Sequence, residues 1–207
     1  MNASLRRAAS VALFAFVAAC STETEAPVIE EGTFVGSLDG SDALFAVTVA
    51  DGEVVAYACG GALTIDIHTR WYRGTLEGDS VTLTSNDGAT GSLTFAGDGV
   101  SGSLTQPGGD VLTLLETTRA VDGSATALFS VVDDGCRTGV IVKQANADEE
   151  PFVQGAWCSI AASASEADIF QQVTPITPIE AGITSLKVEV ANEDKELVAV
   201  LVDPVEF

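Results

Sequence analysis

The chain has few basic residues and almost no histidine. Its 207 residues include nine Lys and Arg against 30 Asp and Glu, with one His, so the formal net charge is −21. A generic nucleic-acid binder needs clustered Lys and Arg for phosphate contacts, and this composition excludes that class. A zinc site normally takes several His or Cys ligands at characteristic spacing, which a single His does not supply.

Several catalytic motifs are also missing. The sequence has no Gly-x-Ser-x-Gly elbow, no phosphate-binding loop, no dinucleotide fingerprint and no EF-hand pattern. The hydrophobic fraction of 46% is nevertheless too high for an acidic disordered tail, because such tails cannot bury enough surface to offset chain entropy. The length suits one domain, with one domain plus an appendage as the alternative.

Acidic turns leave one metal open. Pairs of acids such as Asp39 with Asp42, and Asp133 with Asp134, offer the oxygen ligands that calcium prefers. Asp is also common in turns for conformational reasons alone, and this interpretation is the one we favour. We therefore expect no metal site and no cofactor, with weak calcium binding as the alternative.

The N-terminus has the pattern of an export signal. A basic start over residues 1–7 precedes an apolar run over residues 8–19, which is too short to span a membrane as a mature helix. The ending Val17-Ala18-Ala19-Cys20 resembles the lipobox of bacterial lipoproteins. That resemblance implies cleavage before Cys20 and diacylglycerol on its sulfur. It also implies a lipid anchor in the cell membrane or outer membrane, on the exported face.

Processing changes the charge and exposes a tether. Removal of residues 1–19 leaves seven basic residues against 30 acidic ones, hence a net charge of −23. Residues 20–31 contain four acids and a Pro without useful periodicity, which is typical of a linker. Such a segment reaches roughly 35–40 Å when it is fully extended.

Export also favours disulfides, which persist in oxidising compartments. Cys59, Cys136 and Cys158 remain besides Cys20, so at most one bridge forms within the chain. We favour Cys136–Cys158, which closes a loop of about twenty residues and would stabilise the fold by roughly 3 kcal/mol. Cys59–Cys136 and Cys59–Cys158 stay open as alternatives.

Residues 32–158 read as strands separated by turns. Asp-Gly dipeptides begin at positions 39, 51, 87, 98, 122 and 134, and Gly109-Asp110 fills the longest later gap. Asp-Gly suits the positive φ angles of tight hairpins, and short runs of alternating apolar and polar residues lie between the turns. The sequence predicts an all-β fold, an antiparallel meander closed into a small β-barrel, with a β-sandwich as the alternative.

Residues 159–207 read as a C-terminal extension. Ser163 and Glu166 have the spacing of a capping box, which indicates a short helix over residues 164–172. Residues 186–190 and 197–202 then flank Asn192-Glu193-Asp194 as a last hairpin. The sequence does not decide whether this hairpin closes the barrel or forms a satellite.

The candidate ligand-binding residues are His68, Arg70, Trp71 and Arg73. They gather two of the seven mature basic residues, one of two Trp and the single His within six positions of a strongly acidic chain. Arg binds carboxylates through two parallel hydrogen bonds, and Trp offers a stacking face for sugars. The competing interpretation is structural, with the Arg side chains paired to acids and Trp71 packed.

Two further patterns bear on function. The segments Ala56–Gly61, Trp71–Gly74 and Gly78–Leu83 loosely resemble uncharacterised exported bacterial β-domain proteins, which implies export but no activity. Asp66 and His68 stand two apart, so on a strand they share a face and form a candidate hydrolytic pair.

We expect a membrane-anchored lipoprotein that acts as a non-enzymatic binding or structural module of the cell envelope. Its partner would be an envelope protein, a glycan or a small ligand. One alternative is an envelope hydrolase using His68 with Asp66 or an acid pair. The other is an inhibitor or partner of a basic envelope protein, steered by the acidic surface.

Overall fold

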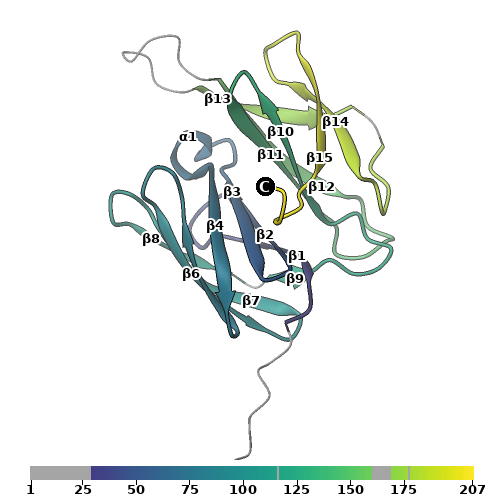
Figure 1. The fold of residues 1–207 in the computed structure, drawn as a ribbon. Coiled ribbons are helices and arrows are strands. Elements are labelled where there is room, and N and C mark those ends of the chain that lie inside the picture. Colours follow the sequence, from purple (N-terminus) through teal and green to yellow (C-terminus); the bar gives the residue numbers. More distant parts are fainter. Residues whose placement is uncertain (1–28, 116, 160–168, 177) are drawn as a thin grey trace, which may run out of the picture.

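The computed structural model describes residues 29–115, 117–159, 169–176 and 178–207. The predicted signal segment, Cys20 and most of the tether lie outside this part of the chain. Nearly all regular structure in the described residues is β-strand, which confirms the all-β prediction. The strands form two sheets, one above the other in Figure 1.

The first sheet is an antiparallel meander of nine strands in the order β8-β7-β6-β5-β4-β3-β2-β1-β9. An isolated bridge between Leu38 and Leu114 joins the end of β8 to the segment after β1, so the sheet curls toward closure. Its strands are β1 (Gly32–Ser37), β2 (Leu44–Ala50), β3 (Glu53–Cys59), β4 (Arg70–Glu77), β5 (Ser80–Thr84), β6 (Thr90–Ala96), β7 (Gly99–Thr105), β8 (Val111–Leu114) and β9 (Thr118–Arg119).

The second sheet is a closed six-stranded barrel, made by β10 (Ala127–Asp133), β11 (Cys136–Lys143), β12 (Phe152–Ser159), β13 (Ile169–Pro175), β14 (Ser185–Val190) and β15 (Glu196–Leu201). The C-terminal hairpin β14–β15 pairs with β13 on one side and β10 on the other, so it completes this barrel. The strands predicted over residues 32–158 are therefore divided between two sheets, and residues 120–126 connect the two. The strands of the predicted C-terminal extension, β13–β15, belong to the same barrel as β10–β12.

Two of the Asp-Gly dipeptides form the tight hairpin turns that the sequence predicted, whereas Asp122-Gly123 lies in the connection between β9 and β10. At Asp51-Gly52 the φ angles are 50° and 79°, and at Asp134-Gly135 they are 48° and 81°. Two consecutive residues at positive φ give the backbone twist that a two-residue hairpin needs. The chain can therefore reverse within two residues between β2 and β3, and between β10 and β11.

Two local predictions were wrong. Residues 169–172 of the predicted helix belong to β13, because Phe170 and its neighbours pair with β12, and residues 164–168 lie outside the described part. The run around His68 is a short helix, α1 (Ile65–His68), rather than a strand. The Asp42 carboxylate accepts bonds from the Leu63 N–H and the Thr64 hydroxyl, which holds the chain in a turn where α1 begins.

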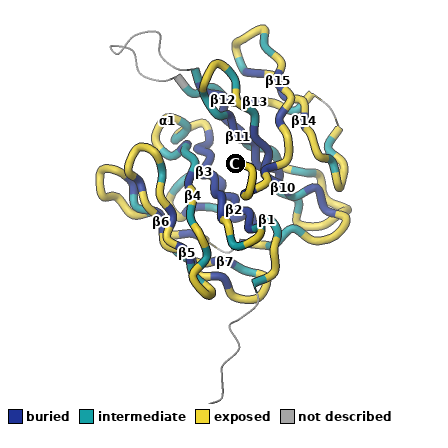
Figure 2. The backbone as a smooth tube through the Cα atoms, viewed as in Figure 1, coloured by how far each residue is buried: buried dark blue, intermediate teal, exposed yellow. Residues whose placement is uncertain are grey.

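The buried apolar side chains of the described residues form three clusters. One fills the first sheet, one fills the barrel, and the third lies between the two sheets. Strands β2 and β3 are consequently buried on both faces, and Figure 2 shows this burial where they face β10 and β11. The third cluster contains Val35, Leu44, Ala46, Val55, Tyr57 and Cys59 from the first sheet, Leu128, Ile141 and Ala156 from the barrel, and Val202, which follows β15.

The cysteines fall as the preferred pairing predicted. Cys136 and Cys158 lie at disulfide distance, with Cα atoms 5.8 Å apart, and join β11 to β12. Cys59 is a buried free thiol. Within the described ranges no helix is long and apolar enough to cross a membrane.

Candidate functional site

A groove of about 640 Å³ lies at the joint between the two sheets. The first sheet contributes α1, the start of β4 and the β5–β6 turn, while the second contributes the β10–β11 hairpin and β13. The lining mixes aromatic, polar and charged side chains from Tyr57, Asp66, Thr69, Arg70, Trp71, Ser85, Asn86, Asp87, Val132, Gly135, Cys136, Arg137, Cys158 and Phe170. Of the four predicted ligand-binding residues, Arg70 and Trp71 therefore line a groove that depends on the packing of both sheets.

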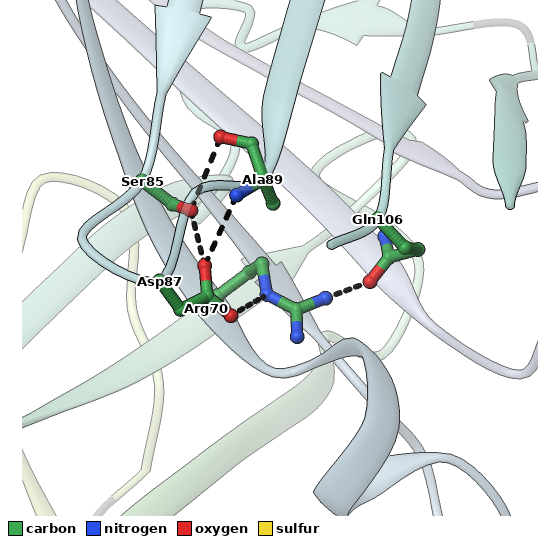
Figure 3. A network of polar contacts seen from close by, with 5 residues as sticks. All are labelled: Arg70, Ser85, Asp87, Ala89 and Gln106. Atoms are coloured by element: carbon green, nitrogen blue, oxygen red, sulfur yellow. Dashed lines mark hydrogen bonds and ion pairs between the residues drawn. The ribbon is translucent and has the colours of Figure 1, made fainter. Parts of the chain in front are cut away.

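Arg70 is held by a polar network at one wall of the groove. Its Nε lies 3.1 Å from Oδ2 of Asp87, and its Nη1 donates to Oε1 of Gln106 (Figure 3). Asp87 also accepts bonds from the Ser85 hydroxyl and the Ala89 N–H. Partial burial acts to raise the pKa of Asp87, but these hydrogen bonds and the charge of Arg70 outweigh it and lower the pKa. Arg70 is thus a fixed, neutralised cation.

The Trp71 ring packs against two other aromatic rings. It stacks on Tyr57, with ring centroids 4.3 Å apart, and its other contact is Phe207, at 4.7 Å. The indole Nε1 donates to the carbonyl of Arg137 at 3.0 Å. The ring thereby joins β4 to β11 and to the end of the chain, as the structural interpretation predicted, and does not offer an open stacking face.

Arg73 lies on the same side of β4 as Trp71, as strand alternation predicted. Its guanidinium carbon is 4.8 Å from the centre of the Phe207 ring, and that of Arg137 is 4.0 Å from the same centre. Arg137 and Phe207 are residues that the sequence analysis missed. They are 64 and 134 positions away from Arg73, and no local pattern marks them; sheet packing brings them together.

His68 contacts Ser41, and no hydrogen bond to Asp66, its predicted partner, is formed among the described residues. Its Nδ1 is 2.7 Å from the hydroxyl of Ser41, which also accepts the Ala43 N–H at 3.1 Å. Burial lowers the pKa of His68, and the positive charge of Arg70 adds to this, while Asp42 acts in the opposite direction. A neutral imidazole beside a hydroxyl fastens α1 to the β1–β2 turn, and it is also the contact from which general-base chemistry starts.

Neither a search for metal-binding clusters nor comparison with known proteins identifies a function for the groove. In the residues that the structure describes, no group of three or more His, Cys, Asp or Glu side chains is arranged to hold a metal ion. Comparison of the chain with protein-family models, curated proteins and solved structures finds no match.

Proposed function

We propose that this protein is an exported, lipid-anchored binding module of the cell envelope, which takes a glycan or small ligand in the groove between its two sheets. The lipobox resemblance supports the anchor at Cys20. The Cys136–Cys158 pair supports export, since disulfides persist in oxidising compartments. The observation that carries the binding role is the groove, to which both sheets contribute.

The chemistry of the groove suits a ligand with both flat and polar surfaces. Ligand sites combine apolar and aromatic walls with a few placed polar groups that fix orientation. Here Phe170 and Val132 supply the apolar part, because the rings of Tyr57 and Trp71 are already packed against each other. Ser85 and Asn86 supply hydrogen-bonding side chains from the β5–β6 turn. A sugar has the same combination of apolar ring face and hydroxyl edge.

A blocking substitution tests the groove. Asn86 is an exposed turn residue that lines it, so Asn86→Trp would fill the groove without disturbing a core. The matched control is Asp110→Trp, at an exposed position before β8 that does not line the groove. We would screen the processed, full-length protein in detergent against an array of envelope glycans and cell-wall fragments.

For a captured ligand, we expect Asn86→Trp to weaken binding at least tenfold while Asp110→Trp binds like the parent protein. Equal binding by both variants would place the ligand elsewhere. The absence of any ligand from the array would count against a glycan module.

Metabolic labelling tests the anchor. Cells grown with labelled palmitate should incorporate it into the parent protein, which should fractionate with membranes. Cys20→Ala should remove both the label and cleavage before residue 20. A parent protein that is unlabelled and found free of membranes would overturn the anchor.

One observation favours a hydrolase as a second candidate. The 2.7 Å contact between the Ser41 hydroxyl and Nδ1 of His68 is the geometry of a nucleophile beside its base. A fluorophosphonate probe should then label Ser41 in the parent protein and fail to label His68→Ala. An unlabelled parent protein would remove this candidate and leave the contact a structural one.

A further inference from the structure

Two guanidinium groups converge on one aromatic ring beside the groove. Arg73 reaches the Phe207 ring from β4 of the first sheet, and Arg137 reaches it from β11 of the second. Arg137 also lines the groove. The ring therefore brings together two cations from strands that belong to different sheets.

Neither cation is neutralised by a carboxylate within the described part of the chain. Arg70 pairs with Asp87, Arg119 pairs with Glu30, and Lys195 pairs with Asp133 and Asp134, but no ion pair involves Arg73 or Arg137. Acids outnumber bases by 30 to nine in this chain. Lys143 and Lys187 also form no ion pair among the described residues, so Arg73 and Arg137 differ from them in converging on one ring.

The arrangement is unfavourable unless something compensates it. Arg137 is half-buried, and both burial and the charge of Arg73 lower its pKa, so the two cations oppose one another. The aromatic ring attracts each cation through its π face. The contact with the ring leaves the N–H donors of both guanidinium groups available. Arg137 uses one of its nitrogens, Nη1, to donate to the hydroxyl of Ser130 at 3.3 Å.

We infer that Arg73 and Arg137 form a seat for an anionic group of the ligand, a carboxylate or sulfate carried by an acidic sugar. This assignment rests on the proposed function, since it places the anion at the edge of the same groove. Guanidinium forks bind such oxyanions through paired, charge-assisted hydrogen bonds. The anion would replace the missing acid and offset the repulsion between the two side chains.

Matched sugars and matched variants test this inference. The sugars are trigalacturonate, its fully methyl-esterified form without charge, and a sulfated galactose trisaccharide. Binding to the processed, full-length protein is measured by titration calorimetry for Arg73→Gln, Arg137→Gln and the control Arg119→Gln. Arg119 is a fair control because it already pairs with Glu30, away from the groove. Thermal unfolding of each variant establishes that it is folded.

We expect the acidic sugars to bind at least tenfold more tightly than the ester, because charge-assisted hydrogen bonds are stronger than those between neutral groups. Arg73→Gln and Arg137→Gln should each remove most of that preference, while Arg119→Gln keeps it.

Preference for the carboxylate or for the sulfate would tell which oxyanion the seat takes. Equal affinity for acid and ester would overturn the anion seat but leave the binding groove standing. If no sugar in this set binds while the array yields another ligand, the anion seat is rejected and the binding groove stands. If neither experiment yields a ligand, both proposals fall.

Discussion

Thr138 shows what one unpaired polar atom does inside the barrel. It is fully buried on β11, and its hydroxyl has no hydrogen-bond partner among the described residues. Such a hydroxyl costs about 1–3 kcal/mol, because it leaves water without replacement. Thr138→Val keeps the shape and removes that cost, so we expect the free energy of unfolding in urea to rise by about 1 kcal/mol.

Thr126 supplies the matched control. Its hydroxyl donates to the carbonyl of Gln144 at 2.9 Å and accepts the Gln144 N–H at 3.0 Å. Thr126→Val should therefore lower stability where Thr138→Val raises it. A loss of stability in both variants would contradict this account of Thr138.

Some residues of the groove could be predicted from the sequence, and others could not. The concentration of Arg70 and Trp71 in an acidic chain was visible in the sequence, and both residues line the groove. Strand alternation correctly placed Trp71 and Arg73 on one face. Arg137 and Phe207 could not be found in this way, because their role depends on which strands of the second sheet face β4.

At the scale of the elements, the barrel closes where β10 meets β15, and we call this junction the seam. Few backbone pairs join the two strands there. Two residue pairs join β10 to β15, Phe129 with Leu201 and Ser130 with Val200, and the Val202 N–H donates to the Leu128 carbonyl just beyond them. Beyond them, Lys195 reaches across to Asp133 and lies 5.1 Å from the Trp157 ring, whose Nε1 donates to Asp133 at 2.9 Å. This ion pair holds together the part of the seam that backbone pairing leaves open.

The seam gives the barrel a predictable pH response. The bond from Lys195, and then that from Trp157, lower the pKa of Asp133 from its ordinary value of 3.8. The folded state thus binds this proton less readily than the unfolded chain, so the stabilisation is complete above about pH 5 and is lost as the pH falls through the folded pKa. We expect Asp133→Asn to reduce stability at pH 7 and to flatten the acid limb of the stability profile.

Asp134→Asn is the control at the seam. Asp134 also contacts Lys195, at 3.3 Å, but its side chain is 79% exposed, so solvent screens the pair. Its acid limb should match that of the parent protein in denaturation at pH 2–7. If Asp133→Asn retains the parental limb as well, the ion pair does not hold the seam.

The contact between strands of different sheets depends on a glycine. A Cβ on Gly139 of β11 would lie 2.5 Å from Cζ of Tyr57 and 2.7 Å from Cζ2 of Trp71. We expect Gly139→Ala to destabilise the protein by about 1–3 kcal/mol, because two packed rings would have to move. Gly108→Ala, where the added Cβ meets nothing within 4 Å, should leave the urea midpoint nearly unchanged. Similar midpoints for both variants would mean that the sheets yield easily.

At the scale of the whole molecule, the shared third cluster makes the two sheets one folding unit. It buries side chains from β1, β2 and β3 against side chains from β10, β11 and β12. Loss of either sheet would expose the other's share of this cluster. We therefore expect one calorimetric transition, coincident with loss of near-ultraviolet and far-ultraviolet circular dichroism. Two separated transitions would show that the sheets unfold independently.

The architecture was only partly visible in the sequence. Turn chemistry and alternation predicted the antiparallel strands, because both signals are local. A closed barrel was expected because closure removes unpaired edges, and it is formed by β10–β15 rather than by all the strands of residues 32–158. The division into two sheets was not predicted, since the turns of both follow the same spacing and residues 120–126 carry no linker signal. The nearly continuous apolar runs in β2 and β3 indicate burial on both faces, and they are the one pattern that points to a second layer.

The central claim is that a ligand binds between the sheets, and hydrogen exchange with and without a captured ligand tests it most directly. We predict that bound ligand slows amide exchange together in residues 84–89, from the first sheet, and residues 132–137, from the second. Protection confined to one sheet, or protection remote from both segments, would contradict the claim.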